Sequence, residues 1–272
     1  MEGYTIVTGA TGGLGAAAVE ALAAKGRPVL LACRNAAKAK AMLGRILQRY
    51  PGTPVLFEQL DLSSIASVKR FADAVPEGIA GLFNNAGTMS RSGFALTDDA
   101  LESTFEVNYF GPWLLTHLLL PKMAPDAAVV NMVSLSSKYV SFSEESLQAS
   151  AESFTQLGSY AASKRALISF SCELARRHPE LRVNMADPGI VGTDMLNLGR
   201  WFDPLQRAVF KPFCKRPSQG VKPALRALET EYSCHYFVGR GSKALPRRYD
   251  TPELDLRVWD TTERILNTIT SR

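Results

Sequence analysis

A glycine-rich turn near the N-terminus constrains the fold of this chain more than any other feature. The apolar run 5–8 leads into residues 9–15, which hold four glycines, and an amphipathic stretch follows as far as Lys25. Glycines let the backbone turn sharply and approach a ligand closely, and the first turn of a helix presents unpaired N–H groups. A strand, a glycine turn and a helix in this order predict a βα unit that binds the pyrophosphate of a dinucleotide.

The rest of the chain alternates short apolar runs with longer amphipathic ones, which is typical of a parallel sheet covered by helices. Strands are expected at Thr5–Thr8, Pro28–Ala32, Val55–Gln59, Gly81–Asn84, Ala128–Val133, Arg182–Ala186 and Tyr236–Val238. Helices are expected at Leu14–Lys25, Ala36–Tyr50, Ile65–Val75 (with Ser63 as N-cap), Asp98–Phe105, Val107–Met123, Tyr160–His178 and Ser218–Thr230. No repeat or low-complexity linker interrupts the chain. We therefore expect one α/β domain over residues 1–272, a doubly wound Rossmann fold with a mostly or wholly parallel, seven-stranded sheet.

Charge and cysteine usage limit the class of function. The 31 basic and 26 acidic residues are spread along the chain, which suits phosphate-bearing ligands and argues against a nucleic-acid partner. The four cysteines (Cys33, Cys172, Cys214 and Cys234) lack C-x-x-C or disulfide-framework spacing, as expected of reduced thiols in a cytoplasmic protein. The three histidines are scattered, so no metal site is predicted.

Neither a secretory nor a membrane-spanning segment is expected. The first residues enter a strand before the apolar core of a signal peptide could fit. The strongest apolar stretch, residues 113–120, is interrupted by His117 and stopped by Pro121. It falls far short of the roughly 20 residues that a spanning helix needs.

The end of the second strand indicates which nicotinamide cofactor binds. Sites specific for NAD usually place Asp or Glu there to hold the ribose 2′-hydroxyl. Here the strand runs into Cys33, Arg34 and Asn35, and Lys38 follows one helical turn later. A guanidinium attracts a 2′-phosphate, so the sequence favours NADPH (NADP+). The alternative is that Arg34 and Lys38 are solvated charges at a helix start.

A tyrosine and a lysine four residues apart indicate the chemistry. Tyr160 and Lys164 lie one helical turn apart and therefore share a face of the expected helix. An ammonium close to a phenol lowers the pKa of the phenol from about 10 towards a value useful for proton transfer. The pair is a candidate for the acid of a carbonyl reductase, although chance also supplies such pairs on solvated helix faces.

Other motifs accompany this pair in the order found in short-chain dehydrogenases/reductases, and the chain resembles that superfamily over about residues 4 to 240. The glycines fit its T-G-x-x-x-G-x-G turn (Gly9, Gly13, Gly15). They equally fit T-G-x-x-G-x-x-G (Gly9, Gly12, Gly15), which resembles sugar-nucleotide epimerases and dehydratases. The N-N-A-G segment 84–87 and the P-G segment 188–193 favour the short-chain form.

The resemblance implies contacts to the cofactor from the glycine turn, from the ends of the next strands and from the P-G segment. The residues concerned are Gly9, Thr11, Gly12, Gly13, Leu14, Gly15, Arg34, Asn35, Lys38, Asp61, Leu62, Asn85, Ala86, Gly87, Tyr160, Lys164, Pro188, Gly189, Val191 and Thr193.

The catalytic set implied by the resemblance comprises Ser134, Tyr160, Lys164 and Asn108. Aligning Asn131 with the asparagine of the family's N-[IV]-S-S segment places Ser134 at the position of the family serine, with Ser136 and Ser137 as alternatives. Ser134 would hydrogen-bond the substrate carbonyl and Tyr160 would protonate the developing alkoxide as general acid. Lys164 would also hold the nicotinamide ribose, and Asn108 would join a water-mediated proton relay.

The substrate end of the chain is predicted to be apolar. Residues 194–216 follow the P-G segment and mix aromatic and aliphatic side chains with basic ones. We expect a substrate lid at about 194–216; packing onto the core or a partner subunit, and peripheral membrane contact through 196–216, are the alternatives. The polar stretch between Ser134 and Tyr160 resembles the retinol-dehydrogenase-like branch, whose relatives often act on lipid carbonyls.

The leading hypothesis is therefore an NADPH-dependent oxidoreductase that reduces an apolar carbonyl compound to an alcohol. A nucleotide-sugar epimerase or dehydratase and a non-catalytic NADP(H)-binding regulator are the competing functions. The long helices expected at 107–123 and 160–178 form dimer faces in many relatives, so a homo-oligomer is an open expectation.

Overall fold

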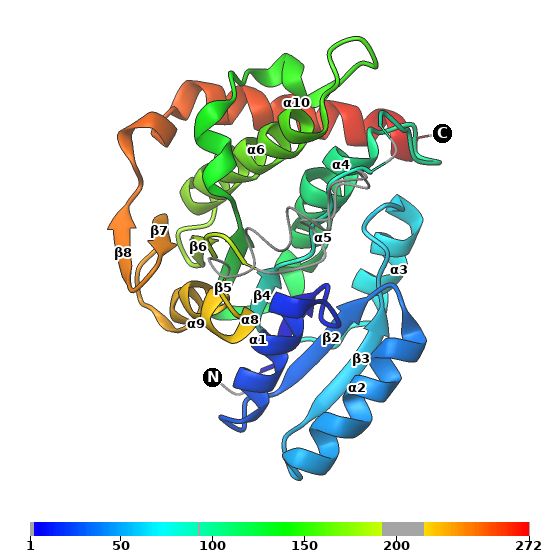
Figure 1. Cartoon of the computed structure of the whole chain (residues 1–272), viewed down its shortest axis with the longest axis vertical. Helices are drawn as coiled ribbons and strands as arrows, with labels where there is room; N and C mark the ends of the chain where they lie inside the picture. Colours follow the sequence, from blue (N-terminus) through cyan, green and yellow to red (C-terminus); the bar gives the residue numbers. More distant parts are fainter. Residues whose placement is uncertain (1–2, 92, 192–214, 272) are drawn as a thin grey trace, which may run out of the picture.

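The computed structural model describes residues 3–91, 93–191 and 215–271, which form one eight-stranded sheet with helices on both faces (Figure 1). The strand order is β3-β2-β1-β4-β5-β6-β7-β8, and every neighbouring pair is parallel except β7 and β8. The doubly wound Rossmann architecture is therefore confirmed. The strands are β1 (Thr5–Thr8), β2 (Val29–Cys33), β3 (Val55–Gln59), β4 (Ile79–Asn84), β5 (Met123–Met132), β6 (Arg182–Asp187), β7 (His235–Val238) and β8 (Gly241–Ala244).

Helical segments connect the strands. The α-helices are α1 (Gly13–Ala23), α2 (Ala36–Arg49), α3 (Ile65–Ala74), α4 (Ser103–Phe105), α5 (Gly111–Leu119), α6 (Gln156–Arg177), α8 (Pro217–Gly220), α9 (Lys222–Glu229) and α10 (Pro252–Thr270). A π-helix, η1 (Glu106–Phe110), precedes α5, and short 3-10 segments occur at η2 (Leu120–Lys122), η3 (Leu135–Tyr139), η4 (Glu144–Leu147) and η7 (Arg247–Tyr249).

The two faces of the sheet carry separate apolar cores because successive side chains of a strand point to opposite faces. Ile6 of β1 belongs to the core with α3, α5, α6 and α10, while its neighbour Val7 belongs to the core with α1, α2 and α9. Strands buried on both faces explain why the apolar runs of the sequence are continuous rather than alternating.

The C-terminal part departs from the prediction. The sheet has an eighth strand, since the exposed residues of β8 pair antiparallel with β7 at the edge of the sheet. Helix α10, which the sequence reading did not include, packs along α6: Trp259 lies 5.8 Å from Phe170 and 5.2 Å from Trp113 between ring centres. Figure 1 shows this helix lying along α6.

Two expected helices in the middle of the chain were wrong in extent. Only 103–105 of the stretch expected at 98–105 is helical, because Ala100 has a positive φ of 59° and Glu102 caps the short α4 with its side chain. The helix expected at 107–123 is a π-helix, an α-helix and a 3-10 turn in succession, and Met123 already begins β5. The N-cap of α3 is Ser64, whose side chain accepts from the Ser67 N–H; Ser63 instead donates to Asp61.

Candidate active site

The carboxyl ends of the central strands form one edge of the sheet, and the order reverses there between β1 and β4. In open α/β sheets ligands bind in the crevice at such a reversal. Four predicted elements meet along this edge: the glycine turn after β1, Asn85 after β4, Ser134 after β5 and Pro188 after β6.

The glycine turn has the backbone geometry that a dinucleotide needs. Gly9 has a φ of +63°, and a Cβ there would lie 3.1 Å from the Ala86 Cα. A Cβ on Gly15 would lie 2.3 Å from the Gly9 carbonyl oxygen and 2.8 Å from Asn85 Nδ2. Gly12 is the N-cap of α1 and offers no side chain to its first N–H groups. An uncapped helix start beside a close-packed glycine turn fits a bound pyrophosphate.

Thr8 ties this turn to the N-N-A-G segment, a role that the sequence reading missed. Its hydroxyl oxygen accepts hydrogen bonds from the N–H groups of Asn85 (3.0 Å) and Ala86 (2.9 Å). Asn85 Nδ2 donates in return to the Thr8 carbonyl (2.7 Å). A threonine directly before the first glycine, at the end of a strand, was the available signal.

The end of β2 presents its basic groups to solvent. Arg34, Asn35 and Lys38 are exposed, and the Arg34 guanidinium lies 3.9 Å from the Asp61 carboxylate, whose other oxygen accepts from Ser63. Asn35 is the N-cap of α2, since its side chain accepts from the Lys38 N–H. An exposed ion pair at this distance contributes little to stability. Arg34 can therefore leave Asp61 and bind a phosphate at little cost in free energy.

Two other residues predicted to contact the cofactor, Thr11 and Leu62, lie near the ends of β2 and β3. Thr11 of the glycine turn hydrogen-bonds Cys33, whose thiol pKa is raised by burial. Leu62 is buried in the core, where its carbonyl oxygen leaves no room for a Cβ on Gly111. Only the backbone of Leu62 is therefore suited to a ligand contact.

Tyr160 and Lys164 both lie in the first half of α6, whose N-cap Thr155 accepts from the Gly158 N–H. Lys164 is 2% exposed, its Nζ donates to the Met132 carbonyl (2.9 Å) and lies 5.9 Å from the centre of the Tyr160 ring. Burial lowers the pKa of Lys164 to about 8. The ammonium form therefore still predominates at pH 7.

Burial has the largest effect on the pKa of the Tyr160 phenol. Burial raises it, a hydrogen bond with Ser134 lowers it, and the charge of Asp187 raises it. The phenol is accordingly neutral at physiological pH and able to donate a proton.

The serine segment after β5 is arranged around Ser134. Ser136 donates to the Ser134 hydroxyl oxygen (3.0 Å), and Ser137 donates to the Ser134 carbonyl (2.7 Å) while also bonding the Tyr249 hydroxyl (2.8 Å). Asn131, which set the alignment, is buried and bonded to Asn84 and to Ser171. Of the three serines, Ser134 is thus the one in hydrogen-bond contact with Tyr160, and the other two hold its loop.

Asn108 lies on the π-helix η1, a type of distortion that often occurs at functional sites. Its Oδ1 accepts from the Thr88 N–H (2.7 Å), and its Nδ2 donates to the Thr88 carbonyl (2.9 Å) and to Ser163 (3.0 Å). A Cβ on Gly87 would lie 3.3 Å from both Asn108 Oδ1 and Lys164 Nζ. Gly87 therefore leaves open the space that these two side chains border.

Asp187 shapes the P-G segment, and the sequence reading overlooked it. The carboxylate is 2% exposed and accepts from the Gly189 N–H (2.8 Å) and the Tyr236 hydroxyl (2.9 Å). Gly189 has a φ of +70°, so the turn after Pro188 requires glycine. Val191 is buried and pairs with Lys215. Thr193 and residues 194–214 of the lid expected at about 194–216 lie outside the described residues.

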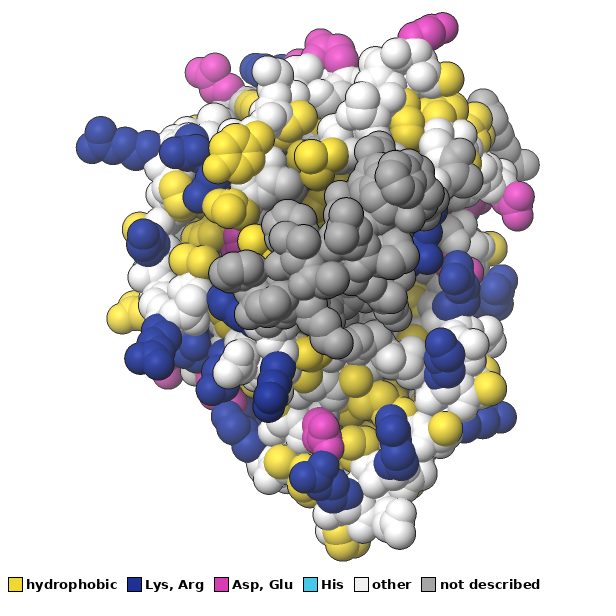
Figure 2. Space-filling view, viewed as in Figure 1, with side chains coloured by type: hydrophobic (Ala, Val, Ile, Leu, Met, Phe, Trp, Pro, Cys, Tyr) yellow, Lys and Arg dark blue, Asp and Glu magenta, His cyan; other side chains and the backbone are white. Residues whose placement is uncertain are grey.

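Other expected features can be compared only over the described part of the chain. There, no group of His, Cys, Asp and Glu side chains is arranged to hold a metal ion. No described helix is both long and apolar enough to span a bilayer. Basic side chains are spread around the face in Figure 2 rather than gathered over one element.

Comparison with known proteins gives consistent matches. The short chain dehydrogenase family model matches residues 4–200. Retinol dehydrogenase 13 of Mus musculus is 31% identical over 96% of this chain and 83% of its own length, and retinol dehydrogenase 11 of Homo sapiens is 35% identical over 83% and 72%. A putative uncharacterized protein from Mycobacterium paratuberculosis superposes with a TM-score of 0.79 at 28% identity, covering 98% of this chain and 94% of that one.

Proposed function

The chain belongs to the short-chain dehydrogenase family, and from that premise we propose that it reduces an apolar carbonyl compound to an alcohol with NADPH. One observation carries the proposal: the neutral Tyr160 phenol, hydrogen-bonded to Ser134, lies on the same helix as Lys164 and at the sheet edge that holds the glycine turn. A proton donor beside a nucleotide cradle is what a carbonyl reductase requires.

The choice of cofactor rests on the basic groups that follow β2. The family uses a nicotinamide cofactor, and bound NADPH would supply the hydride for the carbonyl carbon. In this chain Arg34 and Lys38 hold the 2′-phosphate, because no carboxylate ends β2 and Asp61 already accepts from Ser63. Charge-assisted hydrogen bonds of this kind discriminate a phosphate from a hydroxyl.

Each catalytic side chain has a distinct task. Ser134 donates a hydrogen bond to the carbonyl oxygen, and Tyr160 gives its phenolic proton to that oxygen as negative charge develops on it. Lys164 supplies positive charge close to the phenol and, across the space left by Gly87, faces Asn108. Asn108 is then positioned to hold water that returns a proton towards Tyr160.

Apolar side chains around the site favour a lipid-like substrate. Leu135, Tyr139, Leu157 and Ile190 are all exposed, and they lie within a few residues of Ser134, Tyr160 or Pro188. Exposed apolar side chains in the segments that carry the catalytic residues favour an apolar ligand. Since two relatives are named retinol dehydrogenases, all-trans-retinal is the first substrate to test. We also propose that residues 194–216 form a lid over the substrate and that the protein is cytoplasmic.

The direct test is a screen of NADPH oxidation with retinal, steroid, aromatic and aliphatic carbonyl compounds, with NADH run in parallel. We expect turnover of apolar carbonyls and a preference for NADPH. Tight NADPH binding without turnover of any carbonyl would instead support a non-catalytic regulator, and turnover of nucleotide sugars would support an epimerase.

Variants just before α2 and within it test whether the protein prefers NADPH to NADH. Arg34→Ala should raise the KM for NADPH by about tenfold or more, since a hydrogen bond to a charged group is lost, and should change the KM for NADH little. Arg45→Ala, at an exposed arginine within α2, is the matched control and should leave both KM values unchanged. Equal effects of Arg34→Ala on the two cofactors would contradict the assignment.

A further inference from the structure

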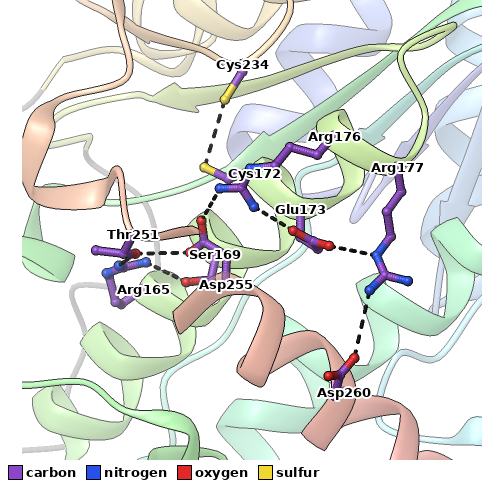
Figure 3. Close-up of polar contacts among 10 residues, drawn as sticks. All are labelled: Arg165, Ser169, Cys172, Glu173, Arg176, Arg177, Cys234, Thr251, Asp255 and Asp260. Carbon is purple, nitrogen blue, oxygen red and sulfur yellow. Dashed lines mark hydrogen bonds and ion pairs between the residues drawn. The ribbon is translucent and has the colours of Figure 1, made fainter. Parts of the chain in front are cut away.

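Two thiols from distant parts of the chain meet beside α6. Cys172 lies on α6, two turns after Lys164, and Cys234 lies in the segment just before β7. Their sulfur atoms are 4.0 Å apart (Figure 3). Cys172 is 1% exposed, whereas Cys234 is partly exposed. The buried thiol and the accessible thiol are therefore close enough for a bond to form between them after one of them is oxidised.

The backbone around Cys234 holds its side chain in this position. Cys234 has a φ of +58°, a conformation uncommon for residues other than glycine, and its N–H donates to the Val183 carbonyl (2.6 Å). Its neighbours are bonded to β6 as well: Ser233 accepts from the Val183 N–H, and the His235 N–H donates to Asn184. Such outliers persist where the surrounding structure enforces them, often at functional positions.

The contact between the two thiols favours ionisation of the accessible one. Arg176 lies one turn after Cys172 on α6, and its guanidinium bonds Glu173 (2.5 Å) and the buried Asp255 (2.6 Å) (Figure 3). The hydrogen bond with Cys172 and the charge of Arg176 lower the pKa of Cys234, while burial and the charges of Asp255 and Asp250 oppose this effect. The same hydrogen bond and burial raise the pKa of Cys172. Cys234 is accordingly the thiol that loses its proton first.

We propose that Cys172 and Cys234 are a modification site at which a peroxide forms a reversible intramolecular disulfide. The Cys234 thiolate attacks the peroxide, the O–O bond breaks, and a sulfenic acid forms with release of water. The Cys172 sulfur then attacks the Cys234 sulfur, the S–O bond breaks, and a second water leaves as the S–S bond forms. The two thiols are oxidised by two electrons and hydrogen peroxide is reduced to two water molecules.

Little movement is needed for this reaction. Closing the sulfur atoms from 4.0 Å to about 2.05 Å is within the reach of side-chain rotation and a small shift of the segment before β7. The bond would link α6, which carries Tyr160 and Lys164, to the C-terminal edge of the sheet. A cross-link that closes a long loop raises the stability of the folded state.

The test treats the full-length protein with hydrogen peroxide and maps its peptides by mass spectrometry without reduction. We expect one cross-linked peptide pair containing Cys172 and Cys234, which disappears after dithiothreitol. The oxidised protein should unfold at a temperature higher by on the order of 5 °C. Peptide mapping separates this product from methionine oxidation.

Variants supply the controls. A Cys33→Ser, Cys214→Ser double variant keeps only the proposed pair and should behave like the parent. Cys172→Ala should lose both the cross-link and the temperature shift, and should trap sulfenic acid at Cys234. The proposal is overturned if the parent protein shows no Cys172–Cys234 peptide under peroxide, or cross-links mainly through Cys33 or Cys214. These outcomes can be read on the parent alone if a variant fails to fold.

Discussion

Gly15 allows a direct test of the glycine turn as the cofactor-binding site, because a side chain at this position would collide with neighbouring atoms. In Gly15→Ala the new Cβ would lie 2.3 Å from the Gly9 carbonyl oxygen and 2.8 Å from Asn85 Nδ2. Ordinary contact of a Cβ begins at 3.4 Å, so the Gly9 backbone must move by about 1 Å. Gly9 belongs to the turn that is proposed to hold the pyrophosphate, and Asn85 belongs to the N-N-A-G segment beside it.

The magnitude follows from two opposing effects. Alanine is a better helix former than glycine by about 1 kcal/mol, which favours the variant because Gly15 lies in the first turn of α1. Overpacking against a backbone carbonyl costs typically 1–3 kcal/mol, so we expect a net loss of stability of about 1 kcal/mol. A displacement of about 1 Å in a ligand-positioning element reduces binding or rate by on the order of 100-fold.

The assay combines NADPH titration by fluorescence with urea unfolding. Gly44→Ala is the matched control: it is exposed on α2, a Cβ there would meet nothing within 4 Å, and the variant should gain stability without a change in NADPH affinity. If Gly15→Ala bound NADPH within about twofold of the parent and matched its stability, the assignment of this turn to the cofactor would be refuted.

Three further variants probe the chemistry and the core. Tyr160→Phe should lose about 100- to 10,000-fold in kcat while keeping its Kd for NADPH, and Tyr232→Phe, an exposed tyrosine, should keep both; near-native turnover of Tyr160→Phe would remove it as the acid. Glu106 is 1% exposed and burial raises its pKa to about 8, so the free energy of unfolding should fall as the pH rises from about 4.5 to about 8, a trend absent in Glu106→Gln. A flat profile of the parent over that range in urea titrations would contradict this. Asp255→Ala removes a buried carboxylate that accepts hydrogen bonds from Arg176 and Thr251, while Glu173 still pairs with Arg176, so it should destabilise by about 2 kcal/mol in urea unfolding, whereas Asp260→Ala at an exposed pair should change stability by less than about 0.5 kcal/mol. Equal losses would show that burial of the pair is unimportant.

Local pattern was sufficient for the central elements of the fold. The apolar run of β1 and the glycine turn are consecutive in the chain, so their structure depends on neighbours within a few residues. Strand β8 has no such signal, since its Gly-Ser-Lys-Ala residues are exposed and it exists only through pairing with β7. Helix α10 did carry a signal in Pro252 at its first turn and in the apolar spacing of Leu254, Val258 and Ile265.

Some residues of the candidate site can likewise be predicted from local sequence, whereas others cannot. Tyr160 and Lys164 share one helix, and their relation follows from helical geometry alone. Thr8 and Asp187 act through hydrogen bonds to chain segments that are distant or turned back on themselves, which no local spacing reveals. The raised pKa of Tyr160 has the same origin, because burial of the phenol depends on the assembled tertiary structure and not on local spacing.

The packing of α10 on α6 has a consequence for how the protein is made. The Tyr109 and Thr262 hydroxyl groups, 2.7 Å apart in the core, are separated by 153 positions along the chain. While the ribosome is still translating residues 252–270, Trp113 and Phe170 have been synthesised but lack the indole of Trp259 that covers them. Until α10 emerges, the helix that carries Tyr160 and Lys164 exposes an apolar face to the cell, so chaperone capture or aggregation competes with folding until residues 252–270 have been synthesised.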